Sequence, residues 1–476
     1  MSSTPPHGSA ADVSSNWVCP FCALLCDDVT IRAYADGTLD APDARCPKLA
    51  HALAGYSGTD AQCSASIDGA PASADDALDR AAQRLARAHR PLFGGLATDV
   101  AGARALYPLA AACGAALDHL HGETLAPAIL AQQDRGALFT TLSEIRTRAD
   151  LVVVFACRPA ERQPRFYERA LGQPGDGGFA RRIVFVGCDA DPAATAYASR
   201  SADVTVETLL ADANPYDTLA RWSARVESRS GAARRTGDDT ATLAALVERI
   251  AGARYTAFVY EPAALPGDHT ALLIEALSRI VKAANRTTRG GALALGGGDG
   301  AATVNQTLTW LSGMPLRTRV AKPARLAGEP PLDHDPYRYR TAQLLERGET
   351  DLLLWIASFG AEPLPAALAP AVPAIVLGHP ALAAPLAARG ASTVFIPVAT
   401  PGIDAGGHLF RVDGPVVLPL AAARGLPLPG VNDVVAKLAE RVAALAGGSN
   451  ASASNGIAAI PLAVASGAAP HAGASA

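Results

Sequence analysis

The sequence lacks an excess of charge of either sign. It has 41 lysines and arginines against 45 aspartates and glutamates, for a formal net charge of −4. A near-neutral chain has no overall basic field to attract a phosphate backbone, which argues against nucleic acid as a partner. Charged residues make up only 18% of the chain and hydrophobic residues 49%. This composition excludes a largely disordered protein and is that of a chain with a sizeable core.

Cysteine and membrane-type segments are also scarce. Eight cysteines in 476 residues are too few for a disulfide scaffold. The uncharged run at 363–388 contains six prolines, so it cannot form a membrane-spanning helix. Residues 1–15 have neither a basic nor an apolar signal region. We therefore expect a soluble, cytoplasmic protein without a membrane partner, in which clustered thiols are free or bind metal.

The composition divides the chain into four parts. Residues 1–15 are polar, contain proline and glycine, and are expected to form a disordered arm. Residues 447–476 are alanine, glycine and serine with almost no charge, which predicts a disordered tail. Between them we expect a small N-terminal segment at 16–60 and a folded body at 61–446, made of two or three interleaved subdomains.

Short apolar runs alternate with alanine-rich helical stretches in the body. Runs of four to six apolar residues that end at glycine, proline or aspartate are typical of buried parallel strands. They occur at 92–96, 151–156, 183–187, 257–260, 292–295, 352–357, 374–377 and 394–398. The fold class predicted is therefore α/β with doubly wound parallel sheets. A ligand would bind in the loops at the carboxyl ends of these strands.

The strongest local signal is a group of four cysteines near the N-terminus. Cys19, Cys22 and Cys26 have the spacing C-x2-C-x3-C, and nineteen residues separate Cys26 from Cys46. Four thiolates at such spacing can bind one [4Fe–4S] cluster, with one cysteine on each iron. A zinc site or unligated buried thiols are the alternatives, although zinc ribbons usually have two C-x2-C pairs.

The other candidate ligands are less informative. Cys113, in an alanine-rich helical stretch, and Cys157 and Cys188, which follow predicted strands, are expected to be packing residues. His119 and His121 would share one face if they lay on a strand, but no histidine pair has metal-binding spacing.

Several segments resemble the B-type chain of formylmethanofuran dehydrogenases, in the molybdopterin oxidoreductase superfamily. The likeness begins at WVCPFCALLCDDVTI and RCPKLAHALAG. It continues through HGETLAPAILAQQDRG, RADLVVVFACRPAERQPRF, GGDGAATVNQTLTWLSGMP and IPVATPGIDAGGHLFRVDGP. These segments cover most of the chain from about residue 17 to residue 420.

The resemblance implies specific cofactors. In that family the B-type chain holds a [4Fe–4S] cluster and a molybdenum or tungsten ion bound by two pterin guanine dinucleotides, and interconverts carbon dioxide and formate. Cys19, Cys22, Cys26 and Cys46 match the cluster ligands. Lys48 matches a basic residue between cluster and pterin, and Asp189 lies where a relative would bind a guanine edge or a ribose hydroxyl.

One position departs from the family pattern. Catalytic relatives have a cysteine or selenocysteine ligand just before a His-Gly pair, where this chain has Leu120 before His121. Leucine has no lone pair for a metal. The chain therefore most resembles the B-type chain of the bacterial formyltransferase/hydrolase complex, which works in one-carbon metabolism (formaldehyde oxidation, methylotrophy) with A-, C- and D-type partners. A structural subunit without catalysis of its own is the first hypothesis.

Two alternatives stay open. One is an active formylmethanofuran dehydrogenase-type oxidoreductase, which the four retained cysteines favour. The other is an iron–sulfur or zinc module in an unrelated assembly.

Overall fold

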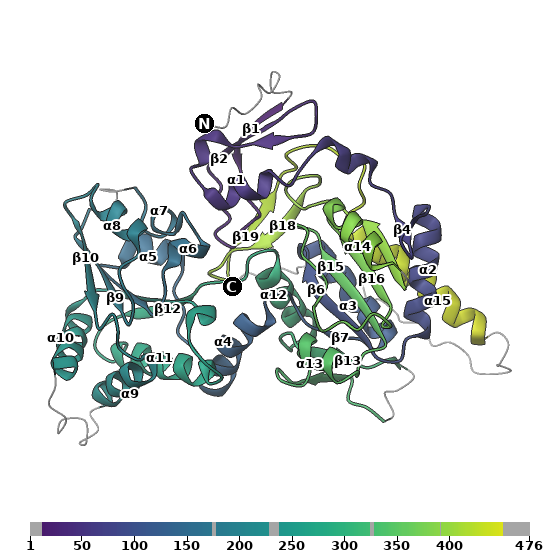
Figure 1. Ribbon diagram of the computed structural model, residues 1–476. Coiled ribbons are helices and arrows are strands. Elements are labelled where there is room, and N and C mark those ends of the chain that lie inside the picture. Colours follow the sequence, from purple (N-terminus) through teal and green to yellow (C-terminus); the bar gives the residue numbers. More distant parts are fainter. Residues whose placement is uncertain (1–11, 174–177, 228–237, 324–327, 391, 451–476) are drawn as a thin grey trace, which may run out of the picture.

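The chain folds into two α/β lobes with a small N-terminal segment placed over both (Figure 1). The structure is a computed structural model that describes residues 12–173, 178–227, 238–323, 328–390 and 392–450. Each of the eight predicted apolar runs overlaps a strand, so the α/β prediction is confirmed. These strands are buried over most of their length, which explains why their sequences are continuous apolar runs rather than alternating ones.

The first lobe, called the five-stranded lobe, contains an all-parallel sheet of order β10-β9-β8-β11-β12. Its strands are β8 (Leu151–Phe155), β9 (Arg181–Val186), β10 (Val204–Leu209), β11 (Thr256–Tyr260) and β12 (Gly290–Ala294). The strand order reverses between β8 and β11, the position where doubly wound sheets open a crevice.

Helices cover both faces of this sheet, because successive side chains of a strand point to opposite faces. Val152 and Val154 pack toward one set of helices, and Leu151, Val153 and Phe155 toward the other. The first set is α5 (Leu142–Arg148), α7 (Phe166–Leu171) and α8 (Pro192–Ala198). The second is α9 (Pro215–Val226), α10 (Asp238–Gly252) and α11 (Thr270–Ala284), with α4 (Gly122–Arg135) beside α11.

The second lobe, called the nine-stranded lobe, has the strand order β14-β13-β7-β6-β15-β16-β17-β4-β5. The core from β7 to β17 is parallel, and the edges are antiparallel. The strands are β4 (Ser66–Ile67), β5 (Ala70–Pro71), β6 (Pro91–Ala97), β7 (Ala116–Leu117), β13 (Thr318–Val320), β14 (Leu332–His334), β15 (Leu352–Ala357), β16 (Ala374–Gly378) and β17 (Thr393–Pro397). The chain leaves this sheet after β7, builds the five-stranded lobe, and returns at β13.

Helices also cover both faces of the nine-stranded sheet. One face packs against α2 (Ala74–Arg87), α3 (Val100–Cys113), α12 (Ala301–Ser312) and α15 (Val431–Asn450). The other packs against α13 (Thr341–Glu346) and α14 (Ala383–Arg389). Cys113 is buried at the end of α3, as expected of a packing residue. No helix within the described ranges is both long and apolar enough to cross a membrane.

The N-terminal segment is a three-stranded antiparallel sheet with one helix. It comprises β1 (Asp12–Trp17), β2 (Val29–Ala33), β3 (Leu39–Asp40) and α1 (Pro47–Leu53). It lies near the hairpin of β18 (Gly407–Phe410) and β19 (Val417–Leu420) (Figure 1).

Two predicted boundaries differ from the structure. Strand β1 begins at Asp12, inside the arm expected at 1–15, because pairing with β2 satisfies its backbone groups. Helix α15 continues to Asn450, beyond the tail boundary expected at 447. The remaining predicted arm, 1–11, and tail, 451–476, lie outside the described residues.

Candidate functional site

The four N-terminal cysteines line one pocket. Cys19, Cys22, Cys26 and Cys46 share its wall with apolar residues of the same segment and with Pro164 and Arg165 just before α7. All four thiols are free, and three of them are buried, with Cys46 half-buried. The donor set predicted from the spacing is therefore brought together in space.

A tight loop between β1 and β2 positions three of these thiols. The N–H of Cys19 donates to the carbonyl of Cys26 at 2.9 Å, which closes the loop. Leu25 adopts a left-handed φ of 48°, which turns the chain back toward Cys26. Cys46 comes from the N-cap position of α1, where Pro47 suits the first helical turn.

Burial dominates the electrostatics of the pocket. It raises the pKa of Cys19 and Cys22, and it raises the pKa of Cys26 to about 12. Repulsion between neighbouring thiolates adds to the shift at Cys19 and Cys26. Without a cation the thiols of Cys19, Cys22 and Cys26 are neutral, and metal ligation would require their deprotonation.

The fit of these donors to a metal depends on how they are arranged. Among the described residues no three His, Cys, Asp or Glu side chains are placed to hold a single metal ion. The four cysteines nevertheless line one pocket. Four cysteines around a common space are the donor set of a cubane cluster, in which each thiolate binds a different iron.

Ion pairs attach the cysteine segment, defined here as residues 12–56, to the five-stranded lobe. Arg165 donates to both carboxylate oxygens of Asp28 at 2.7 and 2.6 Å, and Arg169 pairs with Asp27. Hydrogen bonding to Arg165 lowers the pKa of Asp28. The sequence assigned no role to the two aspartates, because their arginine partners lie about 140 residues away.

Buried hydrogen bonds attach the same segment to the nine-stranded lobe. The indole N–H of Trp17 donates to the carbonyls of Gly402 and Ala421 at 2.9 and 3.1 Å. The hydroxyl of Tyr56 donates to the carbonyl of Phe359 at 3.1 Å and lies 3.2 Å from Thr400 Oγ1. The segment that carries the four cysteines therefore connects the two lobes.

Lys48 lies where the segment meets the glycine-rich loop after β12. A Cβ placed on Gly298 would be 3.7 Å from Lys48 Nζ and 3.8 Å from Cys22 Cα. The lysine charge favours the Cys22 thiolate, although burial keeps the pKa of that thiol raised. Lys48 thus lies between the cysteine pocket and this loop, and a role toward a second cofactor stays a prediction.

Asp189 follows β9 and is largely exposed. Its side chain is 74% exposed and pairs with Arg158 at 3.1 Å. The neighbouring Asp191 is buried, caps α8 and accepts the hydroxyl of Tyr167 at 3.1 Å. A nucleotide contact by Asp189 stays a prediction. Of the two nearby thiols expected to be packing residues, Cys157 is buried and Cys188 half-buried.

The segment around Leu120 runs from the end of β7 into the first residues of α4 and is called here the β7–α4 turn (residues 118–123). The strand considered for His119 and His121 is wrong, because β7 ends at Leu117 and His121 is the N-cap residue of α4. His119 is buried, which lowers its pKa to about 4. His121 Nε2 lies 3.4 Å from Asp299 Oδ2, in the loop after β12.

Both the backbone and the side chain of Leu120 make contacts that fix its position. Its N–H donates to the carbonyl of Gly95, at the end of β6, at 2.7 Å. Its side chain packs against a cluster containing Leu25 and Phe359, and against another containing Trp355. An aliphatic side chain thus fills the position that the family resemblance assigns to a metal ligand.

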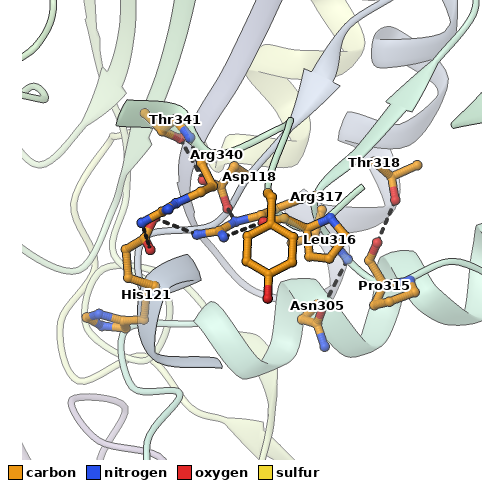
Figure 2. Close-up of polar contacts among 12 residues, drawn as sticks. Asp118, His121, Asn305, Pro315, Leu316, Arg317, Thr318, Arg340 and Thr341 are labelled. Atoms are coloured by element: carbon orange, nitrogen blue, oxygen red, sulfur yellow. Dashed lines mark hydrogen bonds and ion pairs between the residues drawn. The ribbon is translucent and has the colours of Figure 1, made fainter. Parts of the chain in front are cut away.

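A network of ion pairs and hydrogen bonds stabilises the β7–α4 turn (Figure 2). Arg317, on β13's N-terminal side, is 3% exposed and bonds Asp118 at 3.2 Å and Glu123 at 2.8 Å. Asp118 also accepts the backbone N–H and hydroxyl of Thr341 at 2.9 and 2.8 Å. Arg340 binds the other side of Glu123. Burial opposes ionisation of Glu123, but the two arginines outweigh it and lower its pKa.

Gly122 is required by this packing. A Cβ at that position would lie 2.4 Å from Asp118 Oδ1 and 2.8 Å from Arg317 Nη2. The His-Gly pair noticed in the sequence therefore has a steric cause in this chain. The arginines of the network were not predicted, because nothing in the local sequence links them to a turn some 200 residues earlier.

Comparisons with known proteins find chains similar to this one. No protein-family model matches the chain. The chain is 27% identical over 381 residues to the B-type chain of the formyltransferase/hydrolase complex of Methylorubrum extorquens, covering 79% of this chain and 96% of that protein. It is 26% identical over 417 residues to the B-type chain of tungsten-containing formylmethanofuran dehydrogenase 2 of Methanocaldococcus jannaschii, covering 84% and 92%.

The chain is a homologue of these B-type chains. Its fold is also that of a chain in the crystal structure of the Methylorubrum extorquens formyltransferase/hydrolase complex with methylofuran. That match has a TM-score of 0.66 at 24% identity and covers 81% of this chain and 100% of the other. The family resemblance seen in the sequence is therefore confirmed, and this chain has the fold that the resemblance implies.

Proposed function

We propose that this chain is the B-type member of a formyltransferase/hydrolase complex and has a structural role in it. Its partners would be A-, C- and D-type subunits, as in the complex whose B-type chain it resembles. The complex would act on formyl groups in one-carbon metabolism, in the formation of formate from formaldehyde. A reducing, cytoplasmic compartment would keep the cysteines available.

The packing of Leu120 is the observation that supports a structural role. The residue directly before His121-Gly122 contributes to two apolar clusters and bonds Gly95 through its backbone. A hydrocarbon side chain offers no donor to molybdenum or tungsten. We therefore do not assign a pterin-bound metal to this chain, and hydrolytic release of formate needs no electron transfer.

The proposal includes a [4Fe–4S] cluster on Cys19, Cys22, Cys26 and Cys46. The grouping of four free thiols in one pocket supports it. Such a cluster would link the loop after β1 to the start of α1. Because the same segment contacts both lobes, the cluster would stabilise the arrangement of the two lobes and would have no part in catalysis.

A second candidate is an active dehydrogenase-type subunit. The retained cysteines and the placement of Lys48 between the pocket and the loop after β12 favour it. In that case the complex would oxidise formyl groups with an electron acceptor.

The two candidates differ in their need for electrons. We expect the complex purified through a tag on this chain to contain the A-, C- and D-type subunits and to release formate equally with and without a viologen acceptor. Formate release that is unchanged by the Leu120→Ala substitution in this chain would agree with a structural role. Formyl oxidation linked to viologen reduction would overturn it in favour of the second candidate.

A further inference from the structure

A separate cavity of about 590 Å³ lies between the five-stranded lobe and α12. Its walls come from α4, α11, the end of β12, α12 and the loop that joins β18 to β19. None of the cysteines and none of the β7–α4 turn lines it. Its volume falls within the range of roughly 300–1,000 Å³ found for small-molecule sites.

Aromatic side chains flank the cavity. Phe139 and Trp310 are 56% and 67% exposed, which is unusual for rings of this size. The ring of Phe410 meets that of Trp310 edge to face, with centroids 5.1 Å apart. These rings offer flat apolar surfaces to an aromatic body.

The lining carries no net charge. Arg411 and Asp413 are its two charged residues, and they pair with each other at 2.8 and 2.7 Å. Asp413 also accepts the N–H of Leu142 at 3.0 Å. A charged ligand would find no free counter-charge here, so the lining favours a neutral one.

The wall also contains a hydroxyl group without a protein partner among the described residues, on a tyrosine that is itself mostly buried. Tyr260 is 5% exposed, and its hydroxyl bonds to no residue in the described part of the chain. Burial raises its pKa, so the hydroxyl is neutral and can both donate and accept. Tyr255, which is also buried, bonds Thr140 Oγ1 at 2.8 Å. Because Tyr260 lines the cavity, its hydroxyl is available to a group supplied from outside the chain.

We propose that this cavity binds a small neutral molecule with a flat aromatic or heteroaromatic body and a hydrogen-bonding group directed at Tyr260. The aromatic body would lie against Phe139, Trp310 and Phe410. The side-chain amide of Gln306 and the hydroxyl of Ser278, which also line the cavity, would contact further polar groups. This inference does not depend on the proposed role in formyl transfer.

The test uses N-phenyl-1-naphthylamine, a neutral aromatic amine whose fluorescence rises in apolar surroundings. We expect saturable one-to-one binding to the full-length chain. Ser278→Phe fills the cavity from α11, and Gln306→Trp fills it from α12. Each should weaken binding at least about tenfold, which corresponds to about 1.4 kcal/mol. Ser199→Phe, on the exposed end of α8, adds the same ring elsewhere and should leave binding unchanged.

Competition between two ligands tests the role of the hydroxyl. Naphthalene and 1-naphthol share a ring system and differ by one hydroxyl group. We expect 1-naphthol to displace the dye at lower concentration than naphthalene, and this difference to vanish in Tyr260→Phe. The Tyr260→Phe variant should keep its affinity for naphthalene, which also shows that it is folded.

Three results would overturn the proposal. The first is an absence of saturable binding, and the second is equal binding by the wild-type chain and both cavity-filling variants. The third is loss of dye binding when the chain is in its complex, which would mean that a partner protein covers the cavity. An unchanged preference for 1-naphthol in Tyr260→Phe would remove the tyrosine from the site.

Discussion

The cysteine segment and the β7–α4 turn meet the same loop after β12 but have opposite chemistry. Lys48 and Cys22 lie near Gly298, and His121 pairs with the next residue, Asp299. The cysteine segment presents four free thiols around a pocket. The turn presents an aliphatic side chain, backed by a buried ion network. One region has therefore kept metal-binding groups, and its neighbour has groups suited to packing.

Under the proposed function, donor groups and redox function are separated within one chain. The segment with the thiols also supplies Trp17 and Tyr56 to the contact between lobes. Its replacement would disturb the fold, so the contact between the lobes is one structural requirement on this segment. In the β7–α4 turn, by contrast, no structural contact among the described residues depends on a metal ligand at position 120.

The largest effect on the metal content and on local protease sensitivity should come from Cys22→Ala. Loss of one thiolate removes a cluster ligand, and the cysteine segment should become at least about tenfold more sensitive to limited proteolysis, because bound metal contributes to folding. Iron content should fall with it. Cys63→Ala, at a half-buried cysteine outside the pocket, is the matched control. Equal cleavage in both variants would show that the pocket holds no metal.

The turn should respond strongly to Arg317→Met. This change leaves Asp118 buried without its charged partner, which typically costs about 3–5 kcal/mol. A clear fall in the thermal midpoint is expected, while Arg338→Met, on a 59% exposed side chain, should change stability by less than about 0.5 kcal/mol. Adding Asp118→Leu to Arg317→Met should recover part of the loss. Similar midpoints for the two single arginine variants would contradict the network described here.

The substitution Leu120→Cys would give the β7–α4 turn a thiol, as the cysteine segment has. It restores a thiol before His121 but removes apolar contacts, so we expect a loss of about 1–2 kcal/mol in stability. Molybdenum and tungsten should still be absent, because the surrounding turn is packed for a hydrocarbon. Elemental analysis of the variant complex measures this directly. Uptake of either metal would show that a complete pterin site survives around the turn.

The smallest effect should be the pH dependence at Glu123. Its pKa is lowered in the folded chain, so its contribution to stability is complete above the unfolded value of about 4.3 and is lost as the pH falls through the folded pKa. The carboxylate is 54% exposed, and solvent limits the effect to less than about 1 kcal/mol. The thermal midpoints of the wild type and Glu123→Gln should differ at pH 6 and converge near pH 3. A constant difference would exclude this titration.

Much of the fold could be predicted because buried parallel strands need continuous apolar runs. The eight runs marked eight strands. The strands β7, β13 and β14 were missed because two or three residues give too short a pattern, and the edge strand β10 was missed because its sequence VTVETL mixes apolar and polar residues. The close spacing of Cys19, Cys22 and Cys26 in the sequence also predicted that they lie together, because one loop contains all three.

The rest of the site depends on distant pairs. Asp118 and Arg317 are 199 residues apart, and Trp17 contacts a carbonyl 385 residues away. No local pattern records such contacts. The same is true of Tyr260, whose isolated hydroxyl became visible only when the surrounding helices were placed.

Metal analysis of the anaerobically purified complex tests the central claim most directly. We predict about four iron atoms per copy of this chain, lost in Cys22→Ala, and no molybdenum, tungsten or pterin. Molybdenum or tungsten at one atom per chain would contradict the structural role, and a chain without iron would contradict the cluster.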